Sequence, residues 1–194
     1  MKKNVTIHEL RQMKGRGDIP GLLTLMDAKR VCEIGVKEGG NFGNLLAPCV
    51  HEAVAIDIWK EGGLRSENDD SCSQPQLDGQ LAGMLAWQER DRRIRVIRNY
   101  SLMACKGFLD AYFDFVYIDA DHTETAVYAD LNAWYPKVRP GGVLAGHDYV
   151  AHTLPCGVKF GVIEALTRFT AEMSLELHVD GELPWHDWFI PVPA

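Results

Sequence analysis

The sequence predicts an α/β fold with a doubly wound, mostly parallel sheet and an antiparallel last strand. Short apolar runs rich in β-branched residues alternate with segments of helical periodicity, which is typical of strands joined by crossover helices. Several of these runs end in Gly or Asp, where the chain turns toward the next helix. The last two runs, 175–179 and 188–192, have no helix between them, so we expect them to pair antiparallel.

The first half of the chain is predicted to hold a helical leader, residues 1–29, and two strands. The run RVCEIG is apolar and ends in Gly, and AVAID is apolar and ends in Asp, so both are expected to be strands. Between them, Phe and Leu residues recur at helical spacing. The expected elements are helices at 7–14 and 20–29, a strand at 30–35, a helix at 41–49 and a strand at 53–57.

Residues 58–77 interrupt this alternation. The segment is polar and rich in Gly, Ser and Asp, and a structureless stretch of that length inside a domain is often functional. We interpret it as a loop over the active site, with a plain surface loop as the alternative.

The second half resumes the alternation of strands and helices. Ser101 is expected to cap the helix after the third strand, Pro136 to end a later helix, and RPGG at 139–142 to form a turn. The expected elements are helices at 78–91, 101–109, 125–135 and 158–172, and strands at 94–98, 113–119 and 143–146. This order is that of a Rossmann-like sheet.

Composition excludes several classes of protein. Of the 194 residues, 46% are hydrophobic and 24% are charged, which excludes a disordered, collagen-like or coiled-coil chain and fits one domain, residues 1–194. The net charge of −7 argues against a nucleic-acid partner bound through a basic face. No stretch approaches the roughly 18 apolar residues of a membrane span.

Targeting and cysteine patterns predict a cytoplasmic protein. The N-terminal lysines are not followed by an apolar run, so we expect no secretory signal. The five cysteines are scattered and form no C-x-x-C pair. That pattern is typical of reduced thiols and argues against a disulfide framework or a cysteine zinc site.

A glycine-rich turn after the first strand is the first candidate ligand site. Glycines let the backbone approach a ligand, and the N-terminus of the following helix would favour its polar groups. The segment Glu33–Gly40 reads E-x-G-x-x-x-G-G, which matches neither the dinucleotide fingerprint G-x-G-x-x-G nor a phosphate-binding P-loop. Glu33 would suit a ligand that carries an ammonium group. Asp57, which ends the second strand, is placed to accept hydrogen bonds from ribose hydroxyls.

Two polar clusters follow the fourth and fifth strands. They are Asp119-Ala120-Asp121-His122 and His147-Asp148. If these strands are parallel neighbours, the clusters meet at the carboxyl edge of the sheet, where open α/β sheets bind ligands. The carboxylates and imidazoles could hold a divalent cation or act as general bases without one.

The glycine-rich turn, the acid that ends the second strand and the two Asp and His clusters follow one another in the order seen in class I S-adenosylmethionine-dependent methyltransferases, and the chain resembles that family. EIGVKEGG resembles the first motif of that family, and AIDIW resembles its strand-two acid. FVYIDADHT followed by WYPKVRPGGVLAGHDY is similar to small-molecule O-methyltransferases of the macrocin and catechol type. The resemblance covers roughly residues 30–192.

The resemblance implies S-adenosylmethionine as the cofactor and the hydroxyl of a small molecule as the methyl acceptor. It also implies leader helices that cover the cofactor, and a possible homodimer. Glu33 and the glycines would hold the methionine end, Asp57 the ribose, and Ser101 would lie near the adenine. The residues expected to bind the cofactor are Glu33, Gly35, Gly39, Asp57, Ser101 and Asp119.

Metal-dependent relatives bind Mg²⁺ through an Asp that ends strand four and an acidic pair that ends strand five. Asp119 and Asp148 match this pattern, but His147 stands where those relatives have an Asp. We therefore expect Mg²⁺, or another divalent cation that imidazole favours, at Asp119, His147 and Asp148. In the alternative without metal, Asp119, His122 and His147 form the catalytic group, and one histidine takes the acceptor's proton.

Two other functions fit parts of the pattern. A metal-dependent hydrolase could use the same Asp and His cluster, but it would leave the glycine motif and Asp57 without a role. A non-catalytic binding module could keep the fold, but the acids at three strand ends argue against it.

Overall fold

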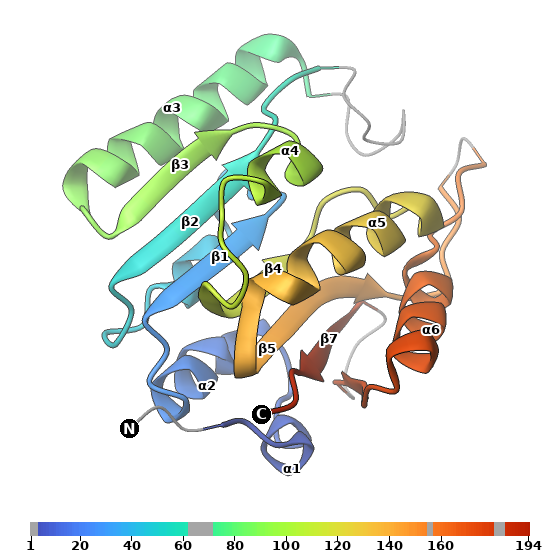
Figure 1. The fold of residues 1–194 in the computed structure, drawn as a ribbon. Coiled ribbons are helices and arrows are strands. Elements are labelled where there is room, and N and C mark those ends of the chain that lie inside the picture. The colour runs from blue at the N-terminus through green and yellow to red at the C-terminus, as the bar shows by residue number, and fades with distance from the viewer. Residues whose placement is uncertain (1–3, 62–71, 155–156, 181–184) are drawn as a thin grey trace.

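The computed structural model describes residues 4–61, 72–154, 157–180 and 185–194. In this part of the chain, seven strands form one sheet in the order β3-β2-β1-β4-β5-β7-β6 (Figure 1). The strands are β1 (Arg30–Ile34), β2 (Glu52–Asp57), β3 (Ile94–Arg98), β4 (Phe113–Ile118), β5 (Val138–Tyr149), β6 (His178–Val179) and β7 (His186–Pro191).

Strands β1 to β5 are parallel, and β7 pairs antiparallel with both β5 and β6. The predicted fold class, a mostly parallel Rossmann-like sheet with an antiparallel last strand, is therefore confirmed. Strand β4 lies between β1 and β5 and is buried along its whole length, which explains its nearly continuous apolar sequence FDFVYI. The strand order reverses between β1 and β4, and open α/β sheets bind ligands at such a switch point.

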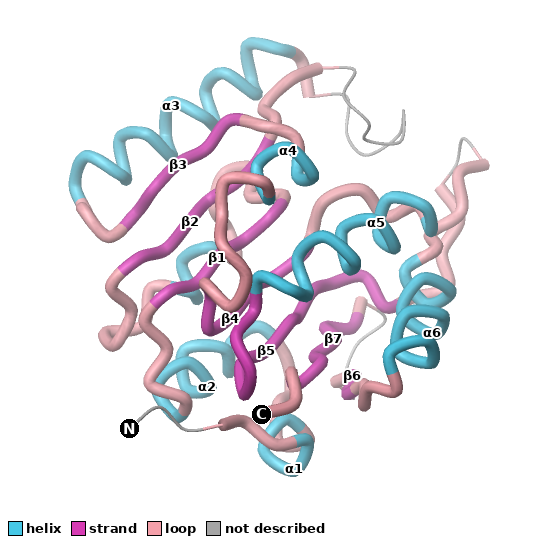
Figure 2. The backbone as a smooth tube through the Cα atoms, in the orientation of Figure 1, coloured by secondary structure: helices cyan, strands magenta, loops and turns pink. Residues whose placement is uncertain are grey.

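Helices cover both faces of the sheet. Those that pack on one face are α1 (Ile7–Leu10), α2 (Ile19–Leu25) and α3 (Gln74–Arg90), with the 3₁₀ helices η1 (Arg16–Asp18) and η2 (Phe42–Leu45). Those on the other face are α4 (Ser101–Cys105), α5 (Glu124–Trp134) and α6 (Val162–Met173), with η3 (Tyr135–Lys137) after α5. Figure 2 shows α4 and α5 crossing in front of the strands.

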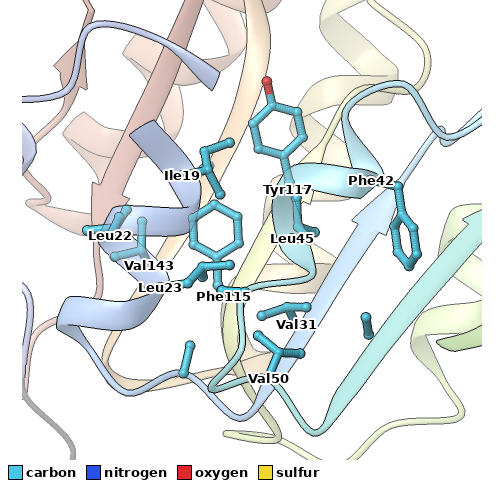
Figure 3. Packing of buried hydrophobic residues seen from close by; sticks show 14 of the residues in the cluster. Ile19, Leu22, Leu23, Val31, Phe42, Leu45, Val50, Phe115, Tyr117 and Val143 are labelled. Carbon is cyan, nitrogen blue, oxygen red and sulfur yellow. The ribbon is translucent and has the colours of Figure 1, made fainter. Parts of the chain in front are cut away.

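The leader helices are part of the core. Ile19 and Leu23 of α2 are fully buried, and they belong to one apolar cluster with Phe115 and Val143 of the sheet (Figure 3). Burial of such side chains stabilises the fold by about 1.5–3 kcal/mol each. This packing fixes the position of η1, which directly precedes α2.

The helix predicted at 41–49 is wrong, because only η2, one short 3₁₀ helix, forms there. Gly43 and Pro48 explain the difference, since both residue types disfavour an α-helix. The glycine turn is therefore not followed by the α-helix N-terminus that we expected to favour the ligand's polar groups.

The turn predicted at 139–142 is also wrong, because these residues lie inside β5. A Cβ on Gly142 would lie 2.7 Å from the carbonyl oxygen of Asp114, so the glycine allows the two strands to approach. Gly141 has φ of +71°, and the register with β4 shifts nearby. The Pro-Gly-Gly sequence therefore forms an irregularity inside a strand, and not a turn before it.

Several boundaries differ from the predictions. Helix α3 begins at Gln74 instead of residue 78, because Ser73 and Gln76 form a capping box at its N-terminus. Ten residues of the loop predicted at 58–77, 62–71, lie outside the described residues. Ser101 is the first residue of α4, whose N-cap is Tyr100.

Candidate active site

The glycine turn brings the ends of β1 and β4 together. Gly35 has φ of +86°, and a Cβ there would lie 1.9 Å from the carbonyl oxygen of Asp119. The amide of Asp119 donates to the carbonyl of Ile34 at 2.8 Å, which fixes this approach. Position 35 therefore needs glycine both for its backbone angle and for the space.

Asp57 holds this loop in place. Its Oδ2 accepts a hydrogen bond from the amide of Lys37 at 2.9 Å, and its Oδ1 accepts one from the amide of Trp59 at 2.9 Å. The indole of Trp59 donates to the carbonyl of Lys37 at 2.8 Å. Lys37 has a positive φ of 51°, so these bonds stabilise a strained loop conformation.

Glu33 is buried at the floor of the turn, with 2% of its surface exposed. Its Oε1 accepts a hydrogen bond from Asn41 Nδ2 at 3.1 Å, and its Oε2 has no partner among the described residues. Burial raises the pKa of Glu33 to about 8. An unpartnered, buried carboxylate oxygen is costly, so it is suited to a ligand that donates to it.

A cavity of about 350 Å³ opens between the glycine turn and the ends of β4 and β5. Glu33, Gly35 and Asn41 line one side of it. Asp119, His122, His147 and Asp148 line another part, which confirms that the two polar clusters meet at one edge of the sheet.

Asp119, His122 and Asp148 form the centre of this cluster. Their ligand atoms lie within 4.8 Å of one another. His122 Nε2 lies 2.6 Å from Asp148 Oδ2 and 3.5 Å from Asp119 Oδ1. Burial opposes a charge on His122, but its hydrogen bonds to the two carboxylates raise its pKa to about 10. His122 is therefore an imidazolium at neutral pH.

The pKa values of the two aspartates are lowered, whereas that of His122 is raised. Burial alone would raise the pKa of Asp148, but hydrogen bonds from His122 and His147 hold it well below its usual range. Against burial, the His122 hydrogen bond and the Arg16 charge lower the pKa of Asp119. Asp148 also has a positive φ of 61°, an uncommon conformation that non-glycine residues adopt at functional sites.

His147 takes a different position from His122. Its Nδ1 lies 2.8 Å from Asp148 Oδ1, and its Nε2 lies 3.9 Å from Asp187 Oδ1. The structure groups Asp119 and Asp148 with His122, and His147 is outside that three-residue group. The metal ligand set Asp119, His147 and Asp148 stays a prediction.

A family model described as "methyltransferase domain" matches residues 32–149, which include all the strand ends of this cavity. The chain belongs to this family. The predicted class, a class I S-adenosylmethionine-dependent methyltransferase, is thereby confirmed.

Solved structures with the same fold include further methyltransferases. One is a putative caffeoyl-CoA O-methyltransferase from Staphylococcus aureus, with a TM-score of 0.64, 14% identity, and coverage of 89% of this chain and 80% of that one. Another is the O-methyltransferase from Bacillus cereus in complex with SAH, with a TM-score of 0.62, 15% identity, and coverage of 91% and 80%. At these identities the likeness shows the fold alone.

The same fold also occurs in spermidine synthase from Thermotoga maritima, with a TM-score of 0.57 and 15% identity over 95% of this chain. This chain spans 60% of that protein, and 56% of a second spermidine synthase structure. No curated protein sequence matches this chain. Among the described residues, no helix is long and apolar enough to cross a membrane.

Three predicted cofactor residues of this methyltransferase, Gly39, Asp57 and Ser101, lie away from the cavity lining. The Ser101 hydroxyl bonds to Asp130 and accepts from Trp134 Nε1 at 2.8 Å, so it joins α4 to α5. A Cβ on Gly39 would lie 2.8 Å from Met84 Sδ of α3, so glycine there allows helix packing and not a ligand's approach. Roles for Gly39, Asp57 and Ser101 in cofactor binding stay predictions.

Sequence reasoning missed Arg16, which the leader places in the methyltransferase cavity. Its Nη2 donates to Asp119 Oδ2 at 3.1 Å, and its Nε donates to Asp187 Oδ1 at 3.4 Å. No motif surrounds Arg16 in the sequence, so the pattern offers no signal for this role.

Sequence reasoning also missed Phe160, which forms part of an aromatic wall beside the histidines. Phe160 stacks on His122, with ring centroids 4.6 Å apart, and contacts the rings of His152 and Trp185. Leu154, Phe160 and Trp185 line the cavity. Trp185 is 42% exposed, which is unusual for such a large apolar side chain.

Proposed function

We propose that this methyltransferase transfers the methyl group of S-adenosylmethionine to a hydroxyl oxygen of a small-molecule acceptor. The observation that carries the proposal is the pairing of two unlike ends in one cavity. Glu33 offers a buried carboxyl oxygen without a partner among the described residues, and another part of the lining offers the His147–Asp148 pair. The first suits the cofactor's ammonium group, and the second suits the removal of a proton.

The cofactor end of the cavity fits the polar groups of S-adenosylmethionine. Glu33 Oε2 would accept from the ammonium, which would compensate for its missing partner. The two oxygens of Asp57 accept backbone hydrogen bonds from Lys37 and Trp59, so this carboxylate orders the loop beside the predicted ribose position.

The reaction would be a displacement at the methyl carbon. The acceptor oxygen forms a bond to the methyl carbon while the carbon–sulfur bond breaks, and the electron pair stays on sulfur. The sulfonium charge is lost in this step, so positioning of the two reactants is the main requirement. The hydroxyl proton must also leave, which calls for a base near the acceptor.

His147 is the better of the two candidate bases. His122 is already protonated at neutral pH, because its two carboxylate partners raise its pKa to about 10. Because Nδ1 of His147 lies 2.8 Å from Asp148 Oδ1, its other ring nitrogen, Nε2, is the atom that would take the acceptor's proton. His122 would then contribute a fixed positive charge, and Asp148 would orient both imidazoles.

A divalent cation also fits the donor atoms at the strand ends. Asp119, His122 and Asp148 would hold it, since their ligand atoms lie within 4.8 Å of one another, and His122 would lose its proton when the ion binds. When bound, it would act as a Lewis acid that lowers the pKa of the acceptor hydroxyl. The imidazole would favour Mn²⁺, Fe²⁺ or Zn²⁺ over Mg²⁺. Loss of activity in excess chelator and recovery with added cation would support this assistance, and full activity in chelator would refute it.

The acceptor would carry an apolar face beside its hydroxyl. Leu154, Phe160 and Trp185 line the cavity next to His122, so they are placed to pack against such a face. The exposed part of Trp185 would become buried when the acceptor binds.

Calorimetry with S-adenosylhomocysteine tests the proposal most directly. We expect the wild type to bind it, Glu33→Gln to bind it more weakly, and Glu89→Gln, which makes the same substitution at an exposed position on α3, to bind it normally. Thermal stabilisation by a divalent cation alone, without any effect of S-adenosylhomocysteine, would favour a metal-dependent hydrolase. A wild type that binds no adenosyl ligand would refute the methyltransferase reading.

A further inference from the structure

Arg16 is a cation that the leader places at the strand ends. Its guanidinium donates to Asp119 Oδ2 at 3.1 Å and to Asp187 Oδ1 at 3.4 Å, and its side chain is 30% exposed to the cavity side. It also lies over the ring of Tyr117, 5.7 Å from the ring centre. The guanidinium is thus held by two carboxylates and one aromatic ring from β4 and β7.

The surrounding structure fixes this position. Asp187 is 2% exposed and also accepts a hydrogen bond from the Tyr117 hydroxyl at 2.5 Å. On the leader side, Asp18 accepts a hydrogen bond from the amide of Lys14 at 2.9 Å, and Ile19 is fully buried in the core. Arg16 therefore reaches the cavity from a backbone that is anchored on both sides.

The contact with Arg16 engages the carboxylate of Asp119, one of the three groups that could hold a metal ion. Asp119 Oδ2 accepts from Arg16, and Asp119 Oδ1 faces His122 at 3.5 Å. A divalent cation bound at Asp119 would have to share that carboxylate with a guanidinium, and two positive charges at such a short range repel each other. The positive charge of Arg16 already balances the negative charge of the Asp119 carboxylate.

We propose that Arg16 sets the metal affinity of this site, because it occupies Asp119 and lowers the affinity of the Asp119–His122–Asp148 group for a divalent cation. The protein then supplies, from its leader, a positive charge that a bound ion would otherwise provide. This inference rests on the proposed function, because it takes the cavity to be the site of methyl transfer. Its test needs neither a cofactor nor an acceptor.

Mn²⁺ binding to the full chain provides the test, measured by calorimetry and by electron paramagnetic resonance of free Mn²⁺. We expect Arg16→Gln to bind Mn²⁺ about 10- to 100-fold more tightly than the wild type, the range by which groups around metal ligands change affinity. Arg11→Gln is the matched control, because it removes the same charge from an exposed residue of the leader. Its Mn²⁺ affinity should equal that of the wild type.

A second substitution locates the ion. Adding Asp119→Asn to Arg16→Gln should abolish the gain, because the freed carboxylate is then absent. If Arg16→Gln does not fold, Arg16→Lys replaces it: a lysine ammonium cannot span Asp119 and Asp187 as the guanidinium fork does, so a smaller gain of the same sign is expected.

Three results would overturn the inference: equal Mn²⁺ affinity in the wild type and Arg16→Gln, no measurable binding in either, or a gain that persists with Asp119→Asn. Binding of S-adenosylhomocysteine is measured separately on the wild type. Failure of that binding would refute the proposed function, whereas the Mn²⁺ comparison would still decide the role of Arg16.

Discussion

Replacing Glu33 with Gln should stabilise the protein and weaken its cofactor binding at the same time. Burial raises the pKa of Glu33 from 4.5 to about 8. Between these values the unfolded chain has lost the carboxyl proton while the folded chain retains it, so the wild type becomes less stable as pH rises. Glutamine has no such proton to lose, and its amide can still bond to Asn41.

The size of the effect follows from the two pKa values. Across this window the wild type loses about 1.4 kcal/mol of unfolding free energy per pH unit. Burial of the ionisable Glu33 therefore lowers the free energy of unfolding by about 1 kcal/mol near pH 5 and by about 3 kcal/mol near pH 7. The stability advantage of Glu33→Gln should grow by about 2 kcal/mol between those two conditions.

Urea unfolding of both proteins at the two pH values measures this difference. Groups that titrate equally in both proteins cancel, among them Asp130, whose pKa burial raises to about 6. Glu38→Gln is the control, since Glu38 is an exposed residue of the same turn. A stability difference between Glu33→Gln and the wild type that does not change with pH would refute the reasoning, because it would mean that Glu33 is ionised throughout.

Three further substitutions test the glycine turn. Gly35→Ala should prevent or severely impair folding, because its Cβ would lie 1.9 Å from the Asp119 carbonyl oxygen; circular dichroism and yield of soluble protein measure this, and a wild-type melting curve would contradict it. Gly39→Val should lower stability by about 1–3 kcal/mol through overpacking against Met84 in urea titrations; unchanged stability would mean that α3 yields without cost. Asp57→Ala should weaken S-adenosylhomocysteine binding by about 1.5–3 kcal/mol in calorimetry, and an unchanged affinity would exclude Asp57 from ribose binding.

The strands could be predicted from the sequence because their signals are local. The run at 94–98 coincides with β3, and the run at 53–57 begins one residue after the start of β2. Acids at the ends of β2, β4 and β5 could be placed at one edge because parallel strands share their carboxyl edge. Signals of this kind depend on neighbours in the chain, so one sequence is sufficient to read them.

The pairing of charges in the cavity could not be predicted, because it depends on packing between distant segments. Arg16 and Asp119 are 103 positions apart, and their contact follows from the burial of Ile19 in the core. His122 and not His147 joins the two aspartates, and Asp148 has a φ of +61°; no sequence pattern indicates either feature. The sequence identified the chemical groups, and three-dimensional packing determined their partners.

The two ends of the cavity differ in charge because their acids have different partners. Glu33 has one neutral amide as a hydrogen-bond partner, so burial dominates and its carboxyl retains a proton near neutral pH. Asp148 is also buried, but two imidazoles bond to it and keep it ionised. An arriving ammonium group would supply at Glu33 the positive charge that His122 already supplies at Asp148. Cofactor binding would therefore release a proton from Glu33, and it should tighten as pH rises toward about 8.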